Sequence, residues 1–261
     1  MKSLGVASAI TVVLSLGVTA PASAAVLPAR GSATAGSSVQ VADAAPRFSM
    51  SDRWAREVTR YGDADTSAYS IAHVRELQYR LRWSGVFHAG VTGFFGTITR
   101  AAVKKYQGRE GLRVTGVAGH LTWAHLIHDT IRHRAAIPHV CKSAGWHACY
   151  DRSMHQVTLW HKGELRNSWL VRGGDYGLET RVGNSRVYYR DIDHVSRLFD
   201  SSMPYSQFFD GGQAYHGSPY MIDPFVDHSH GCVNMYIEDA RQLWNLTSDR
   251  VLDVSVYGAW D

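Results

Sequence analysis

The spacing of hydrophobic residues divides the chain into a helical part and a strand-rich part. Over residues 70–132, apolar side chains recur every three or four positions, which is the repeat of an amphipathic helix. Val74, Leu77 and Leu81 follow this repeat and predict a first helix over His73–Trp83. Glycines then mark loops that separate this helix from two further short helices.

The second helix is expected to begin at Thr97 or Thr99, and the third is expected to span His120–Ile131. The residues expected to face the core are Ile98, Ala102 and Tyr106 in the second helix and Trp123, Leu126, Ile127 and Ile131 in the third. Together the three helices predict a small bundle, whose size is more typical of a binding module than of an enzyme.

The residues before this bundle are expected to form a linker, residues 25–69. Residues 25 to 50 are rich in alanine, serine, glycine and valine and show no apolar repeat, which is typical of a disordered tether. Trp54, Val58 and Tyr61 give residues 51–70 some helical character.

From Ile137 onward the pattern predicts strands. Residues alternate over Gln156–Trp160, a turn is expected at His161–Glu164, and Leu165–Val171 forms the returning strand. The further elements expected are a short strand at Val187–Tyr189, a helix at Ile237–Leu246 and a closing strand at Val251–Tyr257. We therefore expect an α+β protein of two domains, a three-helix bundle at residues 70–132 and a mainly-β domain at residues 138–258.

Composition and charge exclude one class of partner. The 261 residues are 45% hydrophobic, with eight tryptophans and thirteen tyrosines, enough to build substantial cores. The formal net charge of +4 is mild and spread along the chain, without a run of lysine and arginine. No nucleic acid partner is therefore expected.

The N-terminus carries the features of a secretion signal. Lys2 gives a positive start, Ile10–Val18 is a short apolar core, and Ala22–Ala24 resembles a small-residue cleavage site. An uncleaved membrane anchor is the alternative, but the apolar core is short for a membrane span. We therefore expect residues 1–24 to be removed and the mature protein to be secreted, without a stable membrane span.

Three cysteines remain in an exported protein. Cys141 and Cys149 lie eight positions apart, and in an oxidising compartment they most simply form a local disulfide. Cys232 is then left as a free thiol, which is a liability outside the cell unless it has a function. Its neighbours, a glycine, a histidine and an asparagine, fit poorly with an inert residue of the core.

A group of chemically reactive residues surrounds Cys232. His216–Ser218 is followed, after a short spacer, by Ser229–Asn234, whose sequence is SHGCVN. A cysteine attacks a carbonyl when a base takes its proton, and His216 and His230 are both candidates for that base. The glycine before the cysteine allows a sharp turn, so that backbone N–H groups can stabilise an oxyanion. The chemistry that these residues indicate is acyl transfer from an amide.

A cluster of histidines does not predict a metal site. Five histidines lie between His120 and His139, but only His125 and His128 share a helical face. No cysteine or pair of carboxylates joins them, so we expect surface histidines. No metal and no cofactor are therefore expected.

The helical part resembles the three-helix peptidoglycan-binding module found on many cell-wall enzymes. The residues that carry this resemblance are Leu77-Gln78, Gly93–Gly96, Thr99–Gln107, Gly111–Gly119 and Thr122–Leu126. They are turn glycines, core residues and helix-forming motifs, so the resemblance implies peptidoglycan as a partner without showing which residues contact it.

The stretch around Cys232 resembles the catalytic motif of the L,D-transpeptidases of the YkuD type, a histidine and a spacer followed by Ser/Thr-His-Gly-Cys-x-Asn. The similarity extends to Thr180–Gly183, Met203–Tyr205 and Gly211–Gly217, and so covers about residues 138–257. Two departures affect the surroundings of the motif: the spacer is shorter than usual, and Arg181 replaces the usual proline.

This resemblance implies a role for each residue of the motif. Cys232 would be the nucleophile and His216 the base, and the backbone carbonyl of Gly217 would orient the imidazole in place of a carboxylate. His230 and Gly231 would help to form the oxyanion hole. Supporting or substrate-binding roles are expected for Ser229 and Asn234, which brace the loop, and for Tyr205, Tyr215 and Ser218 in the pocket wall, although both tyrosines could also be core aromatics.

The reaction implied is the formation of 3→3 cross-links in peptidoglycan by a secreted, wall-associated monomer. The cysteine would release the terminal D-alanine of a tetrapeptide stem and pass the acyl group to an amine, and carbapenems would acylate it. Three alternatives remain open: an L,D-carboxypeptidase, a wall-binding protein without activity, and a zinc peptidase. The last would use His216, His228 and His230 with Asp223 or Asp227.

Overall fold

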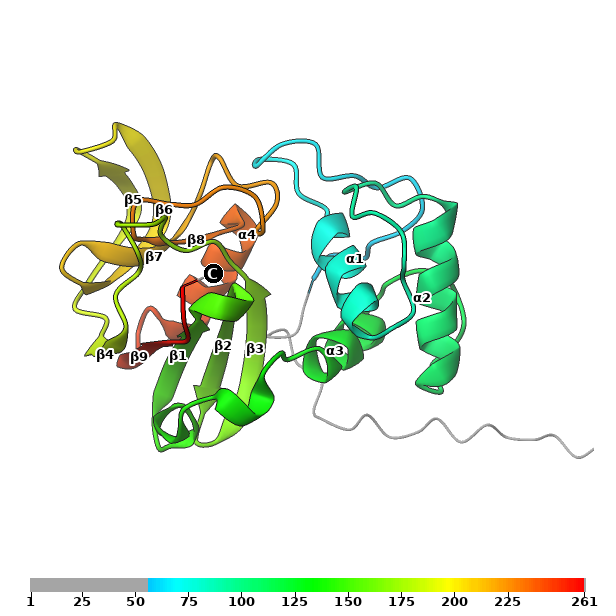
Figure 1. Cartoon of the computed structure of the whole chain (residues 1–261), viewed down its shortest axis with the longest axis horizontal. Helices are drawn as coiled ribbons and strands as arrows, with labels where there is room; N and C mark the ends of the chain where they lie inside the picture. The colour runs from blue at the N-terminus through cyan, green and yellow to red at the C-terminus, as the bar shows by residue number, and fades with distance from the viewer. Residues whose placement is uncertain (1–55, 261) are drawn as a thin grey trace, which may run out of the picture. The chain divides into compact units, whose positions relative to one another are not determined.

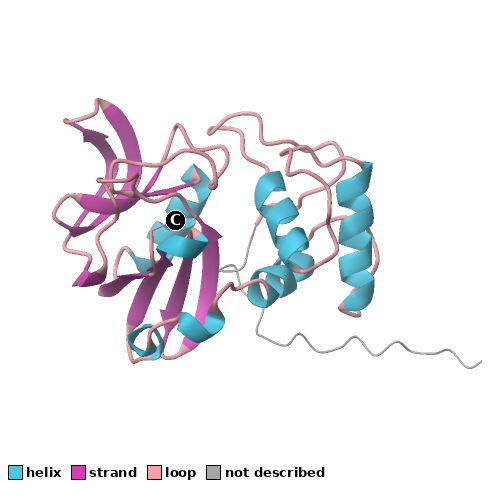
Figure 2. Cartoon of the chain, in the orientation of Figure 1, coloured by secondary structure: helices cyan, strands magenta, loops and turns pink. Residues whose placement is uncertain are grey.

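Figures 1 and 2 show a helical part and a strand-rich part in a computed structural model that describes residues 56–260. The helices and strands in chain order are α1 (Val74–Trp83), α2 (Thr97–Arg109), α3 (His120–Asp129), β1 (Trp146–Asp151), β2 (Gln156–His161), β3 (Glu164–Leu170), β4 (Gly183–Arg186), β5 (Tyr189–Ser196), β6 (Ser201–Asp210), β7 (Gln213–Gly217), β8 (Val233–Met235), α4 (Ile237–Thr247) and β9 (Leu252–Tyr257). The expected α+β class is confirmed. The expected signal peptide, residues 1–24, and residues 25–55 of the expected linker lie outside the described residues.

Helices α1, α2 and α3 pack around an apolar core. The fully buried side chains of this core include Leu77, Leu81, Phe95, Val103, Tyr106, Trp123 and Leu126. Two buried glutamines hold the loops that follow α1 and α2. Gln78 accepts the N–H groups of Thr92 and Gly93, and Gln107 does the same for Thr115 and Gly116. Each glutamine thus satisfies turn groups that would otherwise be buried without a partner.

One side chain of α2 was assigned to the wrong face. Ile98 is 62% exposed, whereas Thr99 is buried together with Ala102 and Tyr106. The hydroxyl of Thr99 accepts a hydrogen bond from the buried side chain of Gln78. The residue that faces inward at the start of α2 is therefore a hydrogen-bonding threonine and not the neighbouring isoleucine.

Residues 56–69 are neither a tether nor a helix, which corrects both expectations. Thr59 forms a β-bridge with Ala118 and is fully buried. The carboxylate of Asp65 accepts the N–H groups of Val74 and Arg75, which are free donors in the first turn of α1. This segment therefore packs as part of the helical domain.

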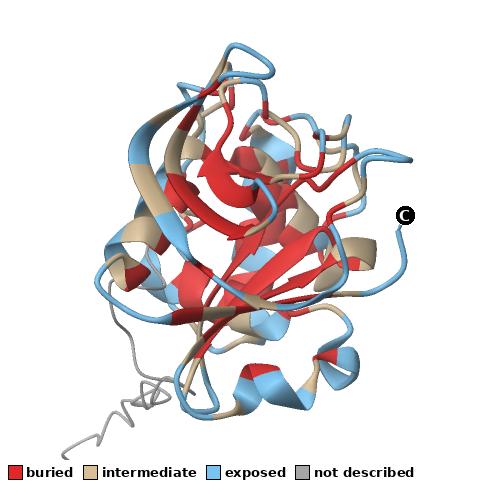
Figure 3. Ribbon diagram, turned by 90° about the vertical axis from the view of Figure 1, so that its left-hand side faces the viewer, coloured by how far each residue is buried: buried red, intermediate tan, exposed pale blue. Residues whose placement is uncertain are grey.

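The strands form two sheets. The first has the order β3-β2-β1-β9-β4, with β1 and β9 parallel, and the second has the order β5-β6-β7-β8, with β7 and β8 parallel. Helix α4 packs on β6 and β7. Figure 3 shows that buried residues concentrate on the strands, and the core between them includes Tyr150, Val157, Trp169, Tyr215, Val233, Leu243 and Val254.

The disulfide between Cys141 and Cys149 is present and joins a short 3-10 turn to β1. Two expected strand positions were wrong, because Val187 and Tyr188 connect β4 to β5 and the strand begins only at Tyr189. None of the helices within residues 56–260 is long and apolar enough to span a bilayer.

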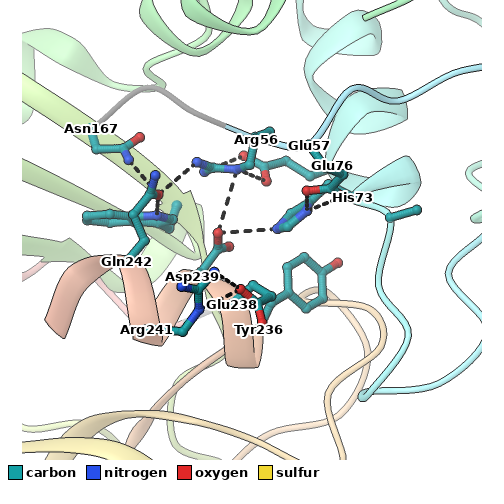
Figure 4. A network of polar contacts seen from close by, with 12 residues as sticks. Arg56, Glu57, His73, Glu76, Asn167, Tyr236, Glu238, Asp239, Arg241 and Gln242 are labelled. Carbon is teal, nitrogen blue, oxygen red and sulfur yellow. Dashed lines mark hydrogen bonds and ion pairs between the residues drawn. The ribbon is translucent and has the colours of Figure 1, made fainter. Parts of the chain in front are cut away.

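Charged side chains, most of them buried, join the helical part to the strand-rich part (Figure 4). Arg56 bonds Glu76 at 3.0 Å and also donates to the carbonyl of Ser168 in β3. His73 lies 2.7 Å from Glu57 and 3.2 Å from Asp239 of α4. All of these contacts lie within one compact unit of the chain.

Candidate active site

Parallel pairing of β7 with β8 brings together the two halves of the sequence motif. His216 on β7 lies opposite Asn234 on β8, and Cys232 directly precedes β8. Paired residues on neighbouring strands project to the same face of a sheet. His216, Cys232 and Asn234 accordingly line one cavity of about 1080 Å³.

The turn before Cys232 is held by Ser229. The Ser229 hydroxyl donates to the carbonyl of Cys232 at 2.6 Å and accepts the N–H of Gly231 at 3.0 Å. Gly231 has a φ of 117°, a conformation that favours glycine. Thr180 fixes the same turn from outside by donating its hydroxyl to the carbonyl of Gly231 at 2.9 Å.

The segment after β3 supports this turn from the other side. The N–H of Ser229 donates to the carbonyl of Gly173, and the N–H of Asp175 donates back to Ser229. The indole N–H of Trp260 donates to the carbonyl of Gly174 at 2.9 Å. The backbone around Cys232 is therefore held by groups that lie far apart in the sequence.

The ring of His216 is buried and oriented by a backbone carbonyl. Its Nδ1 lies 2.9 Å from the carbonyl oxygen of Gly217, which can only accept, so Nδ1 carries the proton. Nε2 is then free to accept a proton. Burial is the main cause that lowers the pKa of His216 to about 4; the bond to Gly217 opposes this shift, and the charges of His194 and Arg172 add to it.

The thiol of Cys232 is protonated at rest. Burial raises its pKa, while a backbone hydrogen bond from Ala214 and the charge of Arg181 oppose this shift. Its Sγ lies 3.8 Å from the carbonyl of Gly212, and the residue remains partly exposed to the cavity. For a neutral thiol and a neutral imidazole that line one cavity, a reaction between them requires proton transfer during attack rather than before it.

The turn between β5 and β6 covers the cavity. Phe199 stacks on the ring of His230, with centroids 4.1 Å apart and planes inclined by 20°. Leu198 next to it is 87% exposed, and both residues line the cavity. His230 therefore lies at the cavity mouth, under this turn.

Helix α1 holds the spacer between His216 and Ser229. The Tyr79 hydroxyl donates to Asp223 at 3.0 Å, and Arg75 lies 3.5 Å from the same carboxylate. The ring of Phe225 lies 4.5 Å from that of Tyr79. Tyr220 in this spacer lines the cavity, so α1 supports a segment that contributes to the wall of the site.

The tyrosines predicted for the pocket wall do not line the cavity. Neighbouring residues on a strand point to opposite faces, so Tyr215 points away from the cavity that His216 faces. Its side chain is fully buried in the core, and its hydroxyl donates to the carbonyl of Ala148. The ring of Tyr205 packs against that of Trp244 in α4, with the ring centroids 6.3 Å apart. Ser218 does line the cavity, and its N–H donates to the carbonyl of Met235.

Several residues of the cavity had no signal in the sequence. They are Arg172, His194, Phe199 and Tyr220, and they come from four separate segments without a shared motif. The backbone contact of Arg172 with Asn234 is an isolated bridge, which the hydrophobic pattern could not indicate.

The donor atoms of a zinc peptidase are not assembled. Within the described residues, two groups of three bring potential metal ligands within 4.8 Å: His73, Glu76 and Asp239, and Glu110, His125 and Asp129. Neither contains His216, His228 or His230, and the first group already pairs with Arg56. His125 is 4% exposed, so the expectation of a surface histidine there was wrong.

Two family models match the chain and define its class. Residues 145–255 match the L,D-transpeptidase catalytic domain, and residues 71–126 match the putative peptidoglycan binding domain. The strand-rich part therefore matches the L,D-transpeptidase catalytic domain and the helical part matches a peptidoglycan-binding domain, and together these matches support an enzyme of this kind.

Solved structures of L,D-transpeptidases resemble it. One from Stackebrandtia nassauensis is 24% identical over 79% of this chain and 96% of its own, with a TM-score of 0.48. One from Xylanimonas cellulosilytica is 26% identical over 78% and 98%, with a TM-score of 0.46. L,D-transpeptidase 3 from Mycobacterium tuberculosis, in complex with a faropenem-derived adduct, is 18% identical over 43% and 60%, with a TM-score of 0.39. No curated protein matches the chain significantly.

Proposed function

We propose that the protein forms 3→3 cross-links in peptidoglycan by cysteine acyl transfer. The observation that carries this proposal is the placement of Cys232 and His216 in one cavity, with the proton of His216 held on Nδ1 by the carbonyl of Gly217. That tautomer leaves Nε2 as a base, and the neutral imidazole is the form that accepts a proton.

In the first half-reaction, the sulfur of Cys232 attacks the carbonyl carbon of an L-centre in a tetrapeptide stem, and His216 takes the thiol proton. The N–H of Cys232, with His230 beside it, stabilises the oxyanion, and Gly231 contributes by shaping the turn, because its own N–H is donated to the Ser229 hydroxyl. The C–N bond then breaks, the imidazolium returns its proton to the leaving amine, and D-alanine departs. A thioester remains on the enzyme.

In the second half-reaction, an amine from a neighbouring stem attacks the thioester. His216 removes a proton from the attacking nitrogen, the C–S bond breaks, and the thiolate recovers a proton from the imidazolium. Asn234 and Ser229 keep the loop in shape throughout. This mechanism uses no metal and no cofactor.

The wider setting of this activity belongs to the same proposal. Residues 1–24 direct secretion, residues 70–132 bind the wall, and residues 138–258 carry the catalysis. The enzyme acts as a monomer at the cell wall. A carbapenem acylates the sulfur of Cys232 and forms a thioester, since a β-lactam presents a strained amide.

The test is product analysis with defined tetrapeptide muropeptides. The expected products are a 3→3 linked dimer and free D-alanine, and intact mass should show one carbapenem bound per chain. Tripeptide and D-alanine without dimer would instead establish an L,D-carboxypeptidase. If neither a product nor an acyl-enzyme formed while Cys232→Ala bound peptidoglycan like the wild type, the chain would be a binding protein without activity.

A further inference from the structure

Arg172 is a buried arginine of the catalytic cavity to which the proposed reaction gives no role. It follows β3, is 4% exposed and lines the same cavity as Cys232. Its backbone exchanges two hydrogen bonds with Asn234, at 2.9 Å and 2.8 Å. Its position is therefore set by the strand that follows the nucleophile.

Strand pairing directs the side chain of Arg172 toward the reacting groups. Arg172 is opposite Asn234, and Asn234 is opposite His216, so the three residues form one row across neighbouring strands. Members of such a row project to the same face, at about 4.8 Å per strand. The charge of Arg172 accordingly contributes to the low pKa of His216.

The guanidinium has more donors than the protein uses. It carries five N–H groups, and Nη1 donates to the carbonyl of Val226 at 2.9 Å. Nε is buried and has no hydrogen-bond partner. The nearest carboxylate, on Asp227, lies 3.9 Å away, and that side chain is 82% exposed. A buried cation is normally paired with an anion, and here its neighbours are a neutral carbonyl and a solvated acid.

We propose that Arg172 determines specificity by binding a carboxylate of the peptide substrate beside Cys232. This inference rests on the proposed function, which places a stem peptide ending in D-alanine in the cavity. A planar guanidinium matches a carboxylate with two parallel hydrogen bonds. Two sources offer this chemistry, the terminal carboxylate of D-alanine and a side-chain carboxylate of the stem.

Binding to an inactive enzyme tests the inference without requiring turnover. In Cys232→Ala, calorimetric titration would compare a tetrapeptide stem with two derivatives, one amidated at the terminal carboxylate and one at the side-chain carboxylate. Amidation of the recognised group should weaken binding on the order of tenfold to a hundredfold, as expected for hydrogen bonds to a charged group. The derivative that binds weakly identifies the carboxylate.

The dependence on that carboxylate should disappear with the arginine. In Cys232→Ala/Arg172→Gln, acid and amide should bind within about twofold of each other, whereas Arg172→Lys should retain part of the difference. Arg181→Gln is the matched control, because it removes another arginine from the same cavity, one that pairs with Asp210 at 2.7 Å. It should leave the ratio of acid to amide binding unchanged.

Two results would overturn the inference: equal binding of all three peptides to Cys232→Ala, or an undiminished penalty for amidation in Arg172→Gln. If Arg172→Gln does not fold, Arg172→Lys decides the question. A ratio of acid to amide binding in Arg172→Lys equal to that with Arg172 intact would also reject a bidentate contact. A carboxylate-dependent affinity without any cross-linked product from the wild type would reject the proposed reaction and leave the role of Arg172 standing.

Discussion

The thiol of Cys232 and the imidazole of His216 are both uncharged at neutral pH, since burial disfavours the charged form of each. In the proposed reaction the thiolate therefore forms only as the sulfur attacks. A neutral thiol also reacts slowly with oxidants, which is consistent with the proposed secretion.

Acylation should persist to unusually low pH. His216 accepts a proton only when neutral, and its pKa is lowered to about 4, so the neutral fraction falls only as the pH approaches that value. The rate of carbapenem acylation, followed by intact mass between about pH 4 and pH 8, should halve near pH 4 rather than near 6.5, the value of an ordinary histidine. A midpoint near 6.5 would show that the ring is solvated in the reacting state.

Substituting Gly231 should impair catalysis strongly. A Cβ there would lie 2.6 Å from Nε2 of Gln213 and 3.2 Å from the carbonyl of Leu178, and φ is 117°. Gly231→Ala should lower the acylation rate on the order of 100-fold by displacing the oxyanion donors. Gly183→Ala is the control, with a φ of 148° and no atom within 4 Å. Equal rates for the two variants would mean that the turn does not set the reacting geometry.

At this scale the motif residues were predictable, and the rest of the cavity was not. Cys232 and His216 lie in a short stretch whose residue types indicate their chemistry. Arg172 and Phe199 reach the cavity only through the sheet arrangement, which no local pattern encodes. Tyr215 is a core aromatic, which was one of its two expected roles, and the choice between them depends on the face to which the strand side chain points.

The helices and the closing strand were predictable because each carries a clear apolar repeat. The β5–β6 hairpin was not, because β5 is mostly exposed and has no apolar face that would show alternation. Residues 56–69 contribute through single polar contacts, such as Asp65 at the start of α1. Contacts of this kind leave no periodic trace in a sequence.

Removing the ring of Phe225 should loosen the spacer. The ring packs against Tyr79, Trp83 and His155, with centroids 4.5, 5.9 and 5.3 Å away. Phe225→Ala should lower the free energy of unfolding by roughly 1–3 kcal/mol, less than the loss of a fully buried phenylalanine side chain.

Phe225→Ala should also slow cross-linking of soluble muropeptides more than carbapenem acylation, since the spacer lines the cavity. Tyr69→Ala, at a 75% exposed aromatic, should change neither rate. Because Tyr220 of the spacer lines the cavity, we expect the spacer to help bind the acceptor stem, and equal slowing of both reactions would contradict this role.

Removing the disulfide should destabilise the protein without affecting the chemistry. Cys141 and Cys149 close a loop with a sequence separation of 8, for which chain entropy predicts about 2.5 kcal/mol. Denaturant unfolding of Cys141→Ser/Cys149→Ser should show this loss, while the folded fraction is acylated at the wild-type rate. Cys232→Ser should show the opposite pattern, with stability retained and acylation by the thiol lost. A double variant as stable as the wild type would contradict the prediction.

At the scale of the whole molecule, ion pairs join the helical part to the strand-rich part. Burial opposes a charge on His73, but Asp239 and Glu57 outweigh it and raise its pKa well above the usual value. Asp239 belongs to α4 and Glu57 to the segment before the helical bundle, so a protonated His73 links the two parts. Arg56 and Glu76 complete the charged surroundings of the ring.

Stability should therefore decline in alkaline solution. A group whose pKa is raised by folding stabilises the protein fully below its unfolded pKa of about 6.5, and this stabilisation is lost as the pH rises through the folded pKa. Thermal unfolding from about pH 6 to pH 9 should show this decline, and His73→Gln should flatten it. His88→Gln, at an exposed histidine of the helical part, should keep the wild-type slope. A slope unchanged in His73→Gln would assign the pH dependence to other groups.

The hold of α1 on the spacer has a consequence for how such a protein can be shortened or recombined. An enzyme fragment beginning at residue 138 would retain every residue of the catalytic motif, yet Asp223 would lose Tyr79 and Arg75, and one face of Phe225 would be opened to water. Exchanging the module for another of the same family would require the same contacts on its first helix. The two parts can therefore not be exchanged independently at the boundary between them. The binding module and the enzyme have to be inherited and redesigned together.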